Sequence, residues 1–344
     1  MRIAVTGSIA TDHLMVFPGR FTEQLLPDQF AHLSLSFLVD RLEVRRGGVA
    51  ANIAYGLGGF GLSPLLVGAV GTDFAEYEVW LKDHGVDTAG VRVSGERQTA
   101  RFLCITDDDA NQIAAFYAGA MAEAYDIGLG ALLTGGERPG LVLVSPDDPS
   151  AMLRHTAECR ALGLPFAADP SQQLARLDGE QVRDLVEGAA WLFTNEYEAA
   201  LLKERTGWSH GEVLAAVGAW VTTLGARGVR IERAGSAPLV VPAVHDAETV
   251  DPTGVGDAFR AGFLAAVSHG LPLEPAARLG CALASVALGA VGSQSHEVDR
   301  AQLSAVVERA YGPGAAAPLA PVLAAPAAGT PCTSMPEAGR DDPA

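Results

Sequence analysis

The stretch that decides the fold is Asp251-Pro252-Thr253-Gly254-Val255-Gly256-Asp257-Ala258-Phe259, a turn of small residues directly before an apolar helical run. Gly254 and Gly256 permit positive φ and leave backbone N–H groups uncovered where the helix dipole favours an anion. Asp257 would repel a phosphate there unless it accepts the proton of a hydroxyl that receives a phosphoryl group. The stretch predicts a phosphoryl-transfer site with its own base, although taken alone it also fits a helix cap after a glycine turn.

Composition limits the class of protein. The chain has 344 residues, of which 49% are hydrophobic and 19% charged, enough for one large α/β domain with a minor appendage. A net charge of -17 argues against a nucleic-acid or anionic-membrane partner, because the field of the protein repels polyanions. There is no apolar run of about 18 residues, and residues 1–7 resemble a first strand rather than a signal peptide. We therefore expect a cytoplasmic protein.

Several common motifs are missing from the sequence. Neither Lys82 nor Lys203 follows a glycine, so the phosphate loop of the commonest nucleoside triphosphatases is absent. The histidines and cysteines show no zinc-site spacing. No G-x-G-x-x-G follows the first strand, which argues against a dinucleotide oxidoreductase. Any nucleotide chemistry must therefore depend on backbone amides, arginine and metal.

Strand-like and helical patterns alternate along the chain, with strands expected at residues 3–6, 65–68, 141–145, 166–169 and 191–194. This alternation is typical of βαβ units and predicts an α/β fold with a mostly parallel sheet. Residues 33–44 alternate with period two, and residues 99–106 and 112–117 flank a polar turn, as in a hairpin. These predict a small antiparallel sheet that serves as a lid, a dimer contact or both. The Pro/Ala-rich tail at 313–344 has no sustained period, so we expect it to be disordered.

Other short motifs carry both a functional and a structural interpretation. Gly48 and Asn52 lie one helical turn apart and fit either a close ligand or a tight turn with a capping Asn. Asp12 could accept two hydrogen bonds from a vicinal diol. Asn195 and Glu198 share one face at the start of a helix, where they could order the waters of a Mg²⁺ ion or simply cap the helix. The glycine turn at 223–228 suits a nucleotide edge or a plain hairpin.

Taken in this order, these motifs resemble those of the ribokinase-like (PfkB-type) carbohydrate kinases. The resemblance runs from Met1 to about Gly312. Within the family, the chain looks most like the adenosine kinases of actinobacteria, and residues 5–15, 33–40 and 168–176 carry this closer resemblance. It implies a ribokinase-like domain at 1–312, with a central mostly parallel sheet flanked by helices. It also implies a small antiparallel β lid formed by segments at about 14–45 and 97–117.

The resemblance further implies an adenosine kinase, which phosphorylates the ribose 5′-hydroxyl with ATP in purine salvage. Asp257 would accept the hydroxyl proton, and the backbone amides of Gly254, Val255 and Gly256 would form an anion hole. Ribose, another nucleoside, or a sensor function without turnover remain alternatives. The residues expected to bind the nucleoside are Ser8, Asp12, Ser36, Gly48, Asn52, Phe102, Phe116, Gln172, Gln173 and Arg176, together with Asp257.

In that set, Asp12, Gly48 and Asn52 would hold the ribose. Phe102 and Phe116 would enclose the purine, with lid core or dimer packing as their alternative. Arg176 would bind a phosphate. The residues expected to bind ATP are Asn195, Thr223, Leu224, Gly225, Ala226, Arg227, Gly228 and Gly256, with Mg²⁺ held by Asn195 and Glu198 through water. Many relatives also hold a monovalent cation such as K⁺ beside Asp251 and Thr253. We expect a homodimer formed through the lid.

Overall fold

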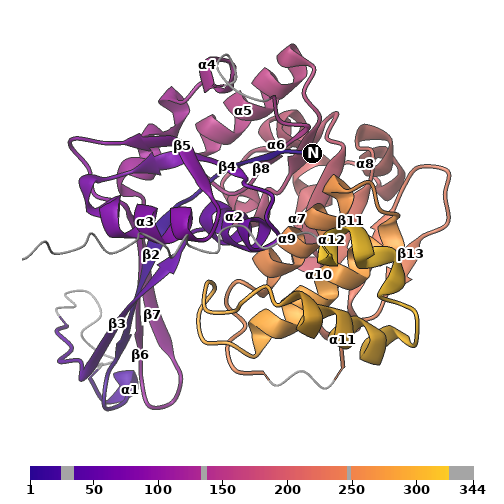
Figure 1. Ribbon diagram of the computed structural model, residues 1–344. Coiled ribbons are helices and arrows are strands. Elements are labelled where there is room, and N and C mark those ends of the chain that lie inside the picture. The colour runs from indigo at the N-terminus through magenta and orange to yellow at the C-terminus, as the bar shows by residue number, and fades with distance from the viewer. Residues whose placement is uncertain (25–34, 133–137, 246–248, 325–344) are drawn as a thin grey trace, which may run out of the picture.

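A large, mostly parallel sheet forms the centre of the protein. The computed structural model describes residues 1–24, 35–132, 138–245 and 249–324 (Figure 1). The sheet has nine strands in the order β13-β12-β11-β10-β9-β8-β1-β4-β5, parallel from β11 to β5 and antiparallel at β12 and β13. Its strands are β1 (Ile3–Thr6), β4 (Leu65–Val70), β5 (Asp87–Val93), β8 (Leu141–Val144), β9 (Phe166–Ala168), β10 (Trp191–Asn195), β11 (Trp220–Thr223), β12 (Val229–Glu232) and β13 (Leu239–Val241).

Side chains that alternate along these strands pack into two separate hydrophobic cores, one on each face of the sheet. In β8, Leu141 and Leu143 join one hydrophobic cluster, while Val142 and Val144 join the other. In β11, Val221 and Trp220 divide in the same way. Both faces of each strand are therefore buried, which explains why the strands are continuous apolar runs in the sequence.

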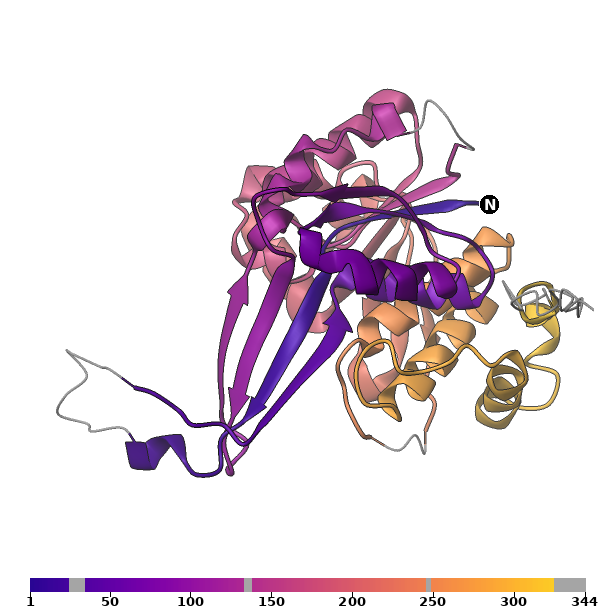
Figure 2. The same ribbon diagram turned by 60° about the vertical axis from the view of Figure 1, so that its left-hand side comes forward.

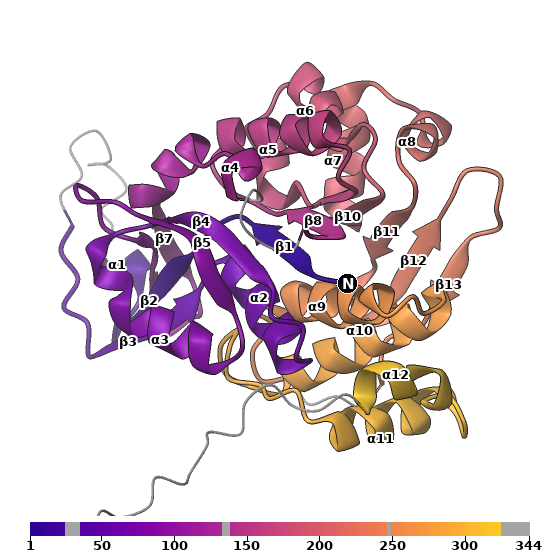
Figure 3. The ribbon, with the colours of Figure 1, turned by 45° about the horizontal axis from the view of Figure 1, so that its top comes forward.

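Helices cover both faces of this sheet (Figure 3). One face carries α2 (Val49–Gly59), α3 (Ala75–Asp83), α9 (Val255–Ser268), α10 (Leu273–Leu288), α11 (Arg300–Tyr311) and α12 (Ala320–Leu323). The opposite face carries α4 (Leu129–Leu132), α5 (Pro149–Leu162), α6 (Gly179–Val186), α7 (Glu196–Thr206) and α8 (His210–Ala216). Short 3₁₀ turns lie at η2 (Thr72–Phe74), η3 (Gly119–Asp126), η4 (Ser171–Ala175), η5 (Gly225–Arg227) and η6 (Ala317–Leu319). The doubly covered sheet confirms the predicted ribokinase-like α/β architecture.

A second sheet of four strands projects from this body, with the short helix α1 (Phe21–Gln24) beyond its far end (Figure 2). Its order is β3-β2-β6-β7, and its strands are β2 (Ala10–Val16), β3 (Arg41–Gly47), β6 (Ala100–Thr106) and β7 (Gln112–Tyr117). The pairs β2 with β3 and β6 with β7 are antiparallel, whereas β2 and β6 run parallel. The small sheet expected from the sequence is present, and we refer to these four strands as the lid sheet.

Two expectations about segment structure are wrong in part. The strand expected at residues 33–44 begins only at Arg41; residues 35–39 form no strand, and residues 33 and 34 lie outside the described part of the chain. The tail was expected to be disordered from residue 313, but η6 packs on α10 and α12 packs on α11, and Leu319 and Val322 are fully buried. Single buried residues in a short alanine-rich segment leave no periodic signal in the sequence. Residues 325–344 lie outside the described residues.

None of the helices in the described residues is long and apolar enough to cross a membrane.

Replacing Leu319 with alanine tests whether the C-terminal segment belongs to the core. The side chain is 0% exposed, so the substitution should lower the free energy of unfolding by about 2 to 5 kcal/mol, as in other buried leucine truncations. Leu38→Ala is the matched control, because Leu38 is 84% exposed. Urea denaturation measures both. Equal stability of the two variants would show that the segment is not part of the folded core.

Candidate active site

The start of α9 forms an anion turn, which we define as residues 254–257. Gly254 precedes the helix with φ 76°, a left-handed conformation that favours glycine. A Cβ on Gly254 would lie 2.5 Å from the Cβ of Ser293, so a larger residue would clash. The amides of Gly256 and Asp257 lie in the first turn of the helix, where no preceding helical carbonyl can accept from them. They are available to an anion at the positive end of the helix dipole.

Asp257 is held between a donor and a cation. The Nδ2 of Asn52, on α2, donates to Asp257 Oδ2 at 2.9 Å. Arg260 follows Asp257 by one helical turn and donates from Nη1 to the carbonyl of Gly256 at 3.0 Å. Burial raises the pKa of Asp257 to about 6, while Arg260 and the Asn52 hydrogen bond act in the opposite direction. The carboxyl is therefore ionised at neutral pH and close to the range in which a base is effective.

Arg260 is itself fixed by a buried ion pair. Its Nε lies 2.6 Å from Asp169 Oδ2, and its Nη2 donates to Asp169 Oδ1 at 2.6 Å. Asp169 directly follows β9, at the carboxyl end of the parallel strands. Both side chains are buried, and one hydrogen bond together with a second close ion-pair contact restricts the guanidinium to one orientation. The ion pair fixes the first turn of α9 to the carboxyl end of the strands of the central sheet.

Two more carboxylates lie beside Asp257. Asp12 on β2 interacts electrostatically with Asp251 and Asp257, and burial raises the pKa of Asp12 to about 6. Arg45 on β3 lies with its Nη1 3.3 Å from Asp251 Oδ2. The same carboxylate also accepts from the amides of Thr253 and Gly292, at 2.9 Å each. Arg45 thus links the lid sheet to the residues that precede the anion turn. The binding of K⁺ beside Asp251 stays a prediction.

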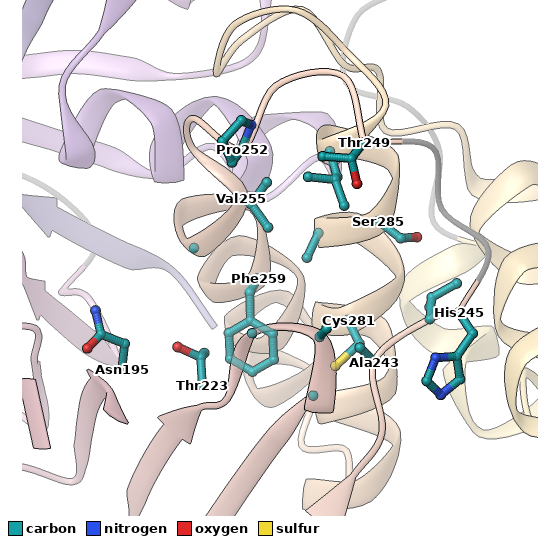
Figure 4. Close-up of a pocket in the computed structure, with 17 residues that line it drawn as sticks. Asn195, Thr223, Ala243, His245, Thr249, Pro252, Val255, Phe259, Cys281 and Ser285 are labelled. Atoms are coloured by element: carbon teal, nitrogen blue, oxygen red, sulfur yellow. The ribbon is translucent and has the colours of Figure 1, made fainter. Parts of the chain in front are cut away.

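On its other side, the anion turn borders a cavity of about 580 Å³ (Figure 4). Gly256 belongs to its wall, one residue before Asp257. The polar residues Asn195 and Thr223 lie at carboxyl ends of the central strands, and α9 and α10 supply apolar walls. The lining residues are Asn195, Thr223, Gly225, Ala226, Gly228, Ala243, Val244, His245, Thr249, Pro252, Val255, Gly256, Phe259, Cys281, Ala284, Ser285 and Leu288.

The glycine turn at 223–228 is both a hairpin turn and part of the cavity wall, which are the two alternatives that the sequence left open. It connects β11 to β12 as a hairpin, closed by a hydrogen bond from the amide of Leu224 to the carbonyl of Gly228 at 2.7 Å, and it also lines the cavity. Leu224 is not among the residues that line the cavity in the described chain. Arg227 is exposed and forms an ion pair with Glu196. Neither of these two side chains is brought to the cavity as expected.

Asn195 and Glu198 form a capping box at the start of α7. Asn195 Oδ1 accepts from the amide of Glu198 at 2.8 Å, and Glu198 Oε2 accepts from the amide of Asn195 at 2.7 Å. Glu198 Oε1 is directed elsewhere and accepts from Ser171 Oγ at 3.3 Å. Within the described residues no group of three histidine, cysteine, aspartate or glutamate side chains could hold a metal by itself. Of this pair, Glu198 Oε1 is the side-chain oxygen that takes no part in the capping box.

Phe102 and Phe116 lie side by side on the lid sheet. They are direct partners across β6 and β7, and Phe102 is in register with Asp12 of β2, which is in register with Arg45 of β3. Side chains in register share one face of a sheet. Because Arg45 pairs with Asp251, this face is turned towards the anion turn. Phe116 is 51% exposed, so the row presents an open aromatic surface beside Asp12.

Asn52 does not cap a helix, which was the structural alternative that the sequence left open for this residue. The cap of α2 is Gly48, which packs so closely on the turn after β1 that a Cβ would lie 2.6 Å from the carbonyl oxygen of Ser8. The hydroxyl of Ser8 accepts from the amide of Val49 at 3.0 Å, so it holds the start of α2. The presence of a serine at position 8 and a glycine at position 48 is thus explained by the packing at the start of α2.

The remaining expected residues are more scattered. Ser36 is exposed and lies outside the lid sheet, because β3 begins only at Arg41, so it is not brought to this site. Gln173 is buried on η4 and donates to the carbonyl of Asp147 at 2.8 Å. Gln172 and Arg176, from the same turn, are exposed.

Sequence reasoning missed Arg260, Asp169, Arg45 and the loop residues Ser293 and Gln294. Arg260 had one available signal, since an arginine one turn after Asp257 interrupts an apolar helix. Ser293 and Gln294 lie in a loop without periodicity, and both donate to Asn52 Oδ1. Nothing local in the sequence marks them, because their partners are more than two hundred positions away.

Comparisons with known proteins show which proteins this chain resembles. The sequence profile of the pfkB family carbohydrate kinases matches residues 6–300. The chain is 32% identical to a nucleoside kinase of Methanothermobacter thermautotrophicus over 275 residues, covering 79% of this chain and 87% of that protein.

Among solved structures, the nucleoside kinase of Burkholderia thailandensis in complex with inosine is 35% identical, with a TM-score of 0.79, and the match covers 90% of this chain and 98% of that one. The same enzyme in complex with ADP-inosine matches at 36% identity and a TM-score of 0.77, covering 90% of this chain and 96% of that one.

Proposed function

The chain belongs to the pfkB family of carbohydrate kinases, and we propose that it is a nucleoside kinase, as its relatives from Methanothermobacter thermautotrophicus and Burkholderia thailandensis are named. It transfers the γ-phosphoryl group of ATP to the ribose 5′-hydroxyl of a nucleoside. The observation that carries this proposal is the position of the anion turn, with Gly256 in the wall of the cavity and Asp257 hydrogen-bonded to Asn52 on the other side. A donor in the cavity and an acceptor beside Asp257 would meet at the start of α9.

In the proposed reaction, Asp257 accepts the proton of the 5′-hydroxyl while that oxygen forms its bond to the γ-phosphorus. The bond from phosphorus to the bridging β-γ oxygen breaks, and ADP leaves with that electron pair. The amides of Gly254, Val255 and Gly256 and the dipole of α9 stabilise the charge on the transferring group, although the amide of Val255 also donates to the carbonyl of Pro252 at 3.4 Å. Phosphoryl transfer depends mainly on such positioning and electrostatics, which suits a site built from backbone amides.

ATP is proposed to occupy the cavity, with its adenine against the apolar wall formed by Ala243, Cys281 and Ala284. Its phosphates then extend towards the anion turn. A divalent cation such as Mg²⁺ fits the donor set near Glu198, whose Oε1 is outside the capping box and can hold a water of the ion. Bound there, the ion would neutralise phosphate charge. In the part of the chain that the structure describes, Arg260 is the one buried cation that acts on Asp257.

The acceptor is proposed to be a purine nucleoside rather than adenosine alone. Two of the relatives that match this chain are named nucleoside kinases, and one of these was solved with inosine, so the broader assignment fits better than the adenosine kinase expected from the sequence. Asp12 and Asn52 are near enough to Asp257 to hold the ribose, and the exposed row of Phe102 and Phe116 can stack on the base.

A substrate panel tests the proposal directly. Adenosine, inosine, guanosine, cytidine, ribose and fructose are each incubated with Mg²⁺ and ATP, and the phosphorylated product is measured. The proposed function requires a nucleoside 5′-monophosphate as the main product, with kcat/KM for a purine nucleoside well above that for ribose. Preferred turnover of ribose or fructose would identify another member of the family.

Replacing Asp257 with asparagine removes the proposed base. The variant should fold normally but lose at least about a hundredfold in turnover, the lower end expected for a lost general base. Because burial raises the pKa of Asp257 to about 6, wild-type turnover should fall as the pH drops through about 6, where the carboxyl becomes protonated. Asp178→Asn, at the exposed cap of α6, is the matched control. Near-normal turnover of Asp257→Asn would exclude Asp257 as the base.

Truncating Phe102 or Phe116 to alanine tests the stacking surface. Each change should remove roughly 1 to 3 kcal/mol of base stacking and raise the KM for a purine nucleoside about five- to hundredfold. The KM for ribose, which has no base, should change little. Tyr197→Ala is the control, because Tyr197 is 75% exposed on α7. If both phenylalanine variants keep the wild-type nucleoside KM, the two rings are lid packing.

The outer face of the lid sheet is proposed to form a homodimer. Leu42 and Val44 are each 58% exposed, and their register partners Met15 and His13 place them on the face opposite Asp12. Ile113 continues the same apolar face on β7. A second copy of this chain would cover these side chains with an identical surface, as in most symmetric dimers.

Light scattering of Val44→Lys tests this contact. The wild-type protein should be a dimer at micromolar concentration, and a buried charge in the interface should convert the variant to a monomer. Val240→Lys on β13 is the control, since Val240 is 57% exposed on a different sheet. A wild-type monomer with full activity would contradict the proposed dimer.

A further inference from the structure

A chain of hydrogen bonds runs from α3 through a loop to the carboxyl group of Asp257. It begins at the indole of Trp80, whose Nε1 donates to Gln294 Oε1 at 3.2 Å. Gln294 Nε2 donates to Asn52 Oδ1 at 2.9 Å, and Asn52 Nδ2 donates to Asp257 Oδ2 at 2.9 Å. Gln294 and Asn52 are both buried, so water does not compete for these bonds.

The chemistry of the groups fixes the direction of this chain. An indole nitrogen can only donate, so Trp80 requires the oxygen of the Gln294 side chain. Tyr77 adds a second constraint, because its hydroxyl donates to the carbonyl of Gly47 at 2.9 Å and can then only accept from Gln294 Nε2, at 2.5 Å. The amide of Gln294 therefore has one orientation, with its nitrogen towards Asn52.

The orientation of Asn52 follows from that of Gln294. Asn52 Oδ1 accepts from Gln294 Nε2 and also from Ser293 Oγ at 3.0 Å. With its oxygen facing the nitrogen of Gln294, the amide must present its own nitrogen to Asp257. An inverted amide would set its nitrogen against Gln294 Nε2 and its oxygen against a carboxylate, leaving buried polar groups unpaired; the hydroxyl of Ser293 can donate or accept and so permits either orientation. One N–H of Asn52 is used on Asp257, and the other is available to a substrate hydroxyl.

We propose that Gln294 is a positioning residue for the reaction. It fixes the Asn52 amide so that Asn52 always donates to Asp257, which holds the carboxylate in its rotamer and in its ionised form before the substrate arrives. This inference rests on the proposed function, in which Asp257 is the base. Gln294 does not touch the reacting atoms, and it acts only through Asn52.

Other charged groups also face Asp257 and remain in place when Gln294 changes. Arg260 lies one turn further on α9, Asp12 comes from β2, and Asp169 follows β9. Among the described residues, none of these groups shares a hydrogen bond or an ion pair with Gln294. A shift in the titration of Asp257 on mutation of Gln294 therefore reports on the hydrogen-bond chain.

The test compares Gln294→Met and Gln294→Glu with the wild-type protein. Methionine keeps the volume but removes the donors, and glutamate puts an acceptor against Asn52 Oδ1. Carboxyl-carbon NMR titration of the protein without substrate, with Asp257→Asn for assignment, should show the Asp257 pKa raised by roughly one unit, the scale of one lost charged hydrogen bond. kcat should fall about tenfold, with the acid limb of the pH profile shifted upwards and KM for ATP unchanged.

Two further variants keep the result interpretable. Trp80→Phe retains an aromatic ring but removes the indole N–H that donates to Gln294, so it should shift the pKa of Asp257 in the same direction by a smaller amount. Tyr55→Phe is the control, since its hydroxyl donates to the carbonyl of His296 at 2.8 Å, beside the chain but outside it. It should leave the titration of Asp257 at the wild-type value.

The outcomes separate this inference from the proposed function. If both folded Gln294 variants keep the wild-type titration of Asp257 and the wild-type pH profile, the positioning role of Gln294 is overturned. If the wild-type protein phosphorylates no nucleoside but the titration still shifts, the hydrogen-bond chain stands and the proposed function fails.

Discussion

The proposed chemistry depends on one electrostatic constraint: a carboxylate lies in the first turn of the helix that is proposed to receive the phosphate. The dipole of α9 and its uncovered amides attract a phosphate, while Asp257 repels it. The two are compatible when a hydroxyl lies between them and gives its proton to the carboxylate. Arg260 and Asn52 offset the cost of keeping Asp257 ionised in a partly buried position. Both partners are in turn fixed, Arg260 by Asp169 and Asn52 by Gln294 and Ser293.

In the proposed reaction, the central sheet and the lid sheet bring the donor and the acceptor to this turn. Strands β10 and β11 end at the cavity, so Asn195 and Thr223 lie in its wall. Strand β2 continues from β1 into the lid sheet and carries Asp12 to the opposite side. Arg45 joins the lid sheet to Asp251, directly before the anion turn. A movement of the lid sheet that breaks this ion pair would therefore change the charge beside the turn.

Much of this could be predicted from the sequence, because the signals are local. Buried strands such as β8 are continuous apolar runs, and the turn before α9 needs glycine at a left-handed position. The parts that could not be predicted depend on distant contacts. Gln294 and Asn52 are neighbours only in the fold, and Leu319 is buried by helices that precede it in the chain. Ser36 was misplaced because alternation at 33–40 does not reveal where pairing with β2 stops.

The central claim is that donor and acceptor bind on opposite sides of the anion turn and that the phosphoryl group passes directly between them. The stereochemistry at phosphorus tests this most directly. ATP made chiral at its γ-phosphoryl group by oxygen isotopes is used to phosphorylate the preferred nucleoside, and the configuration of the product is determined. A single in-line transfer predicts inversion. Retention would mean that the group first bonds to the protein, for example to Asp257, and would contradict the assignment of that residue as a base.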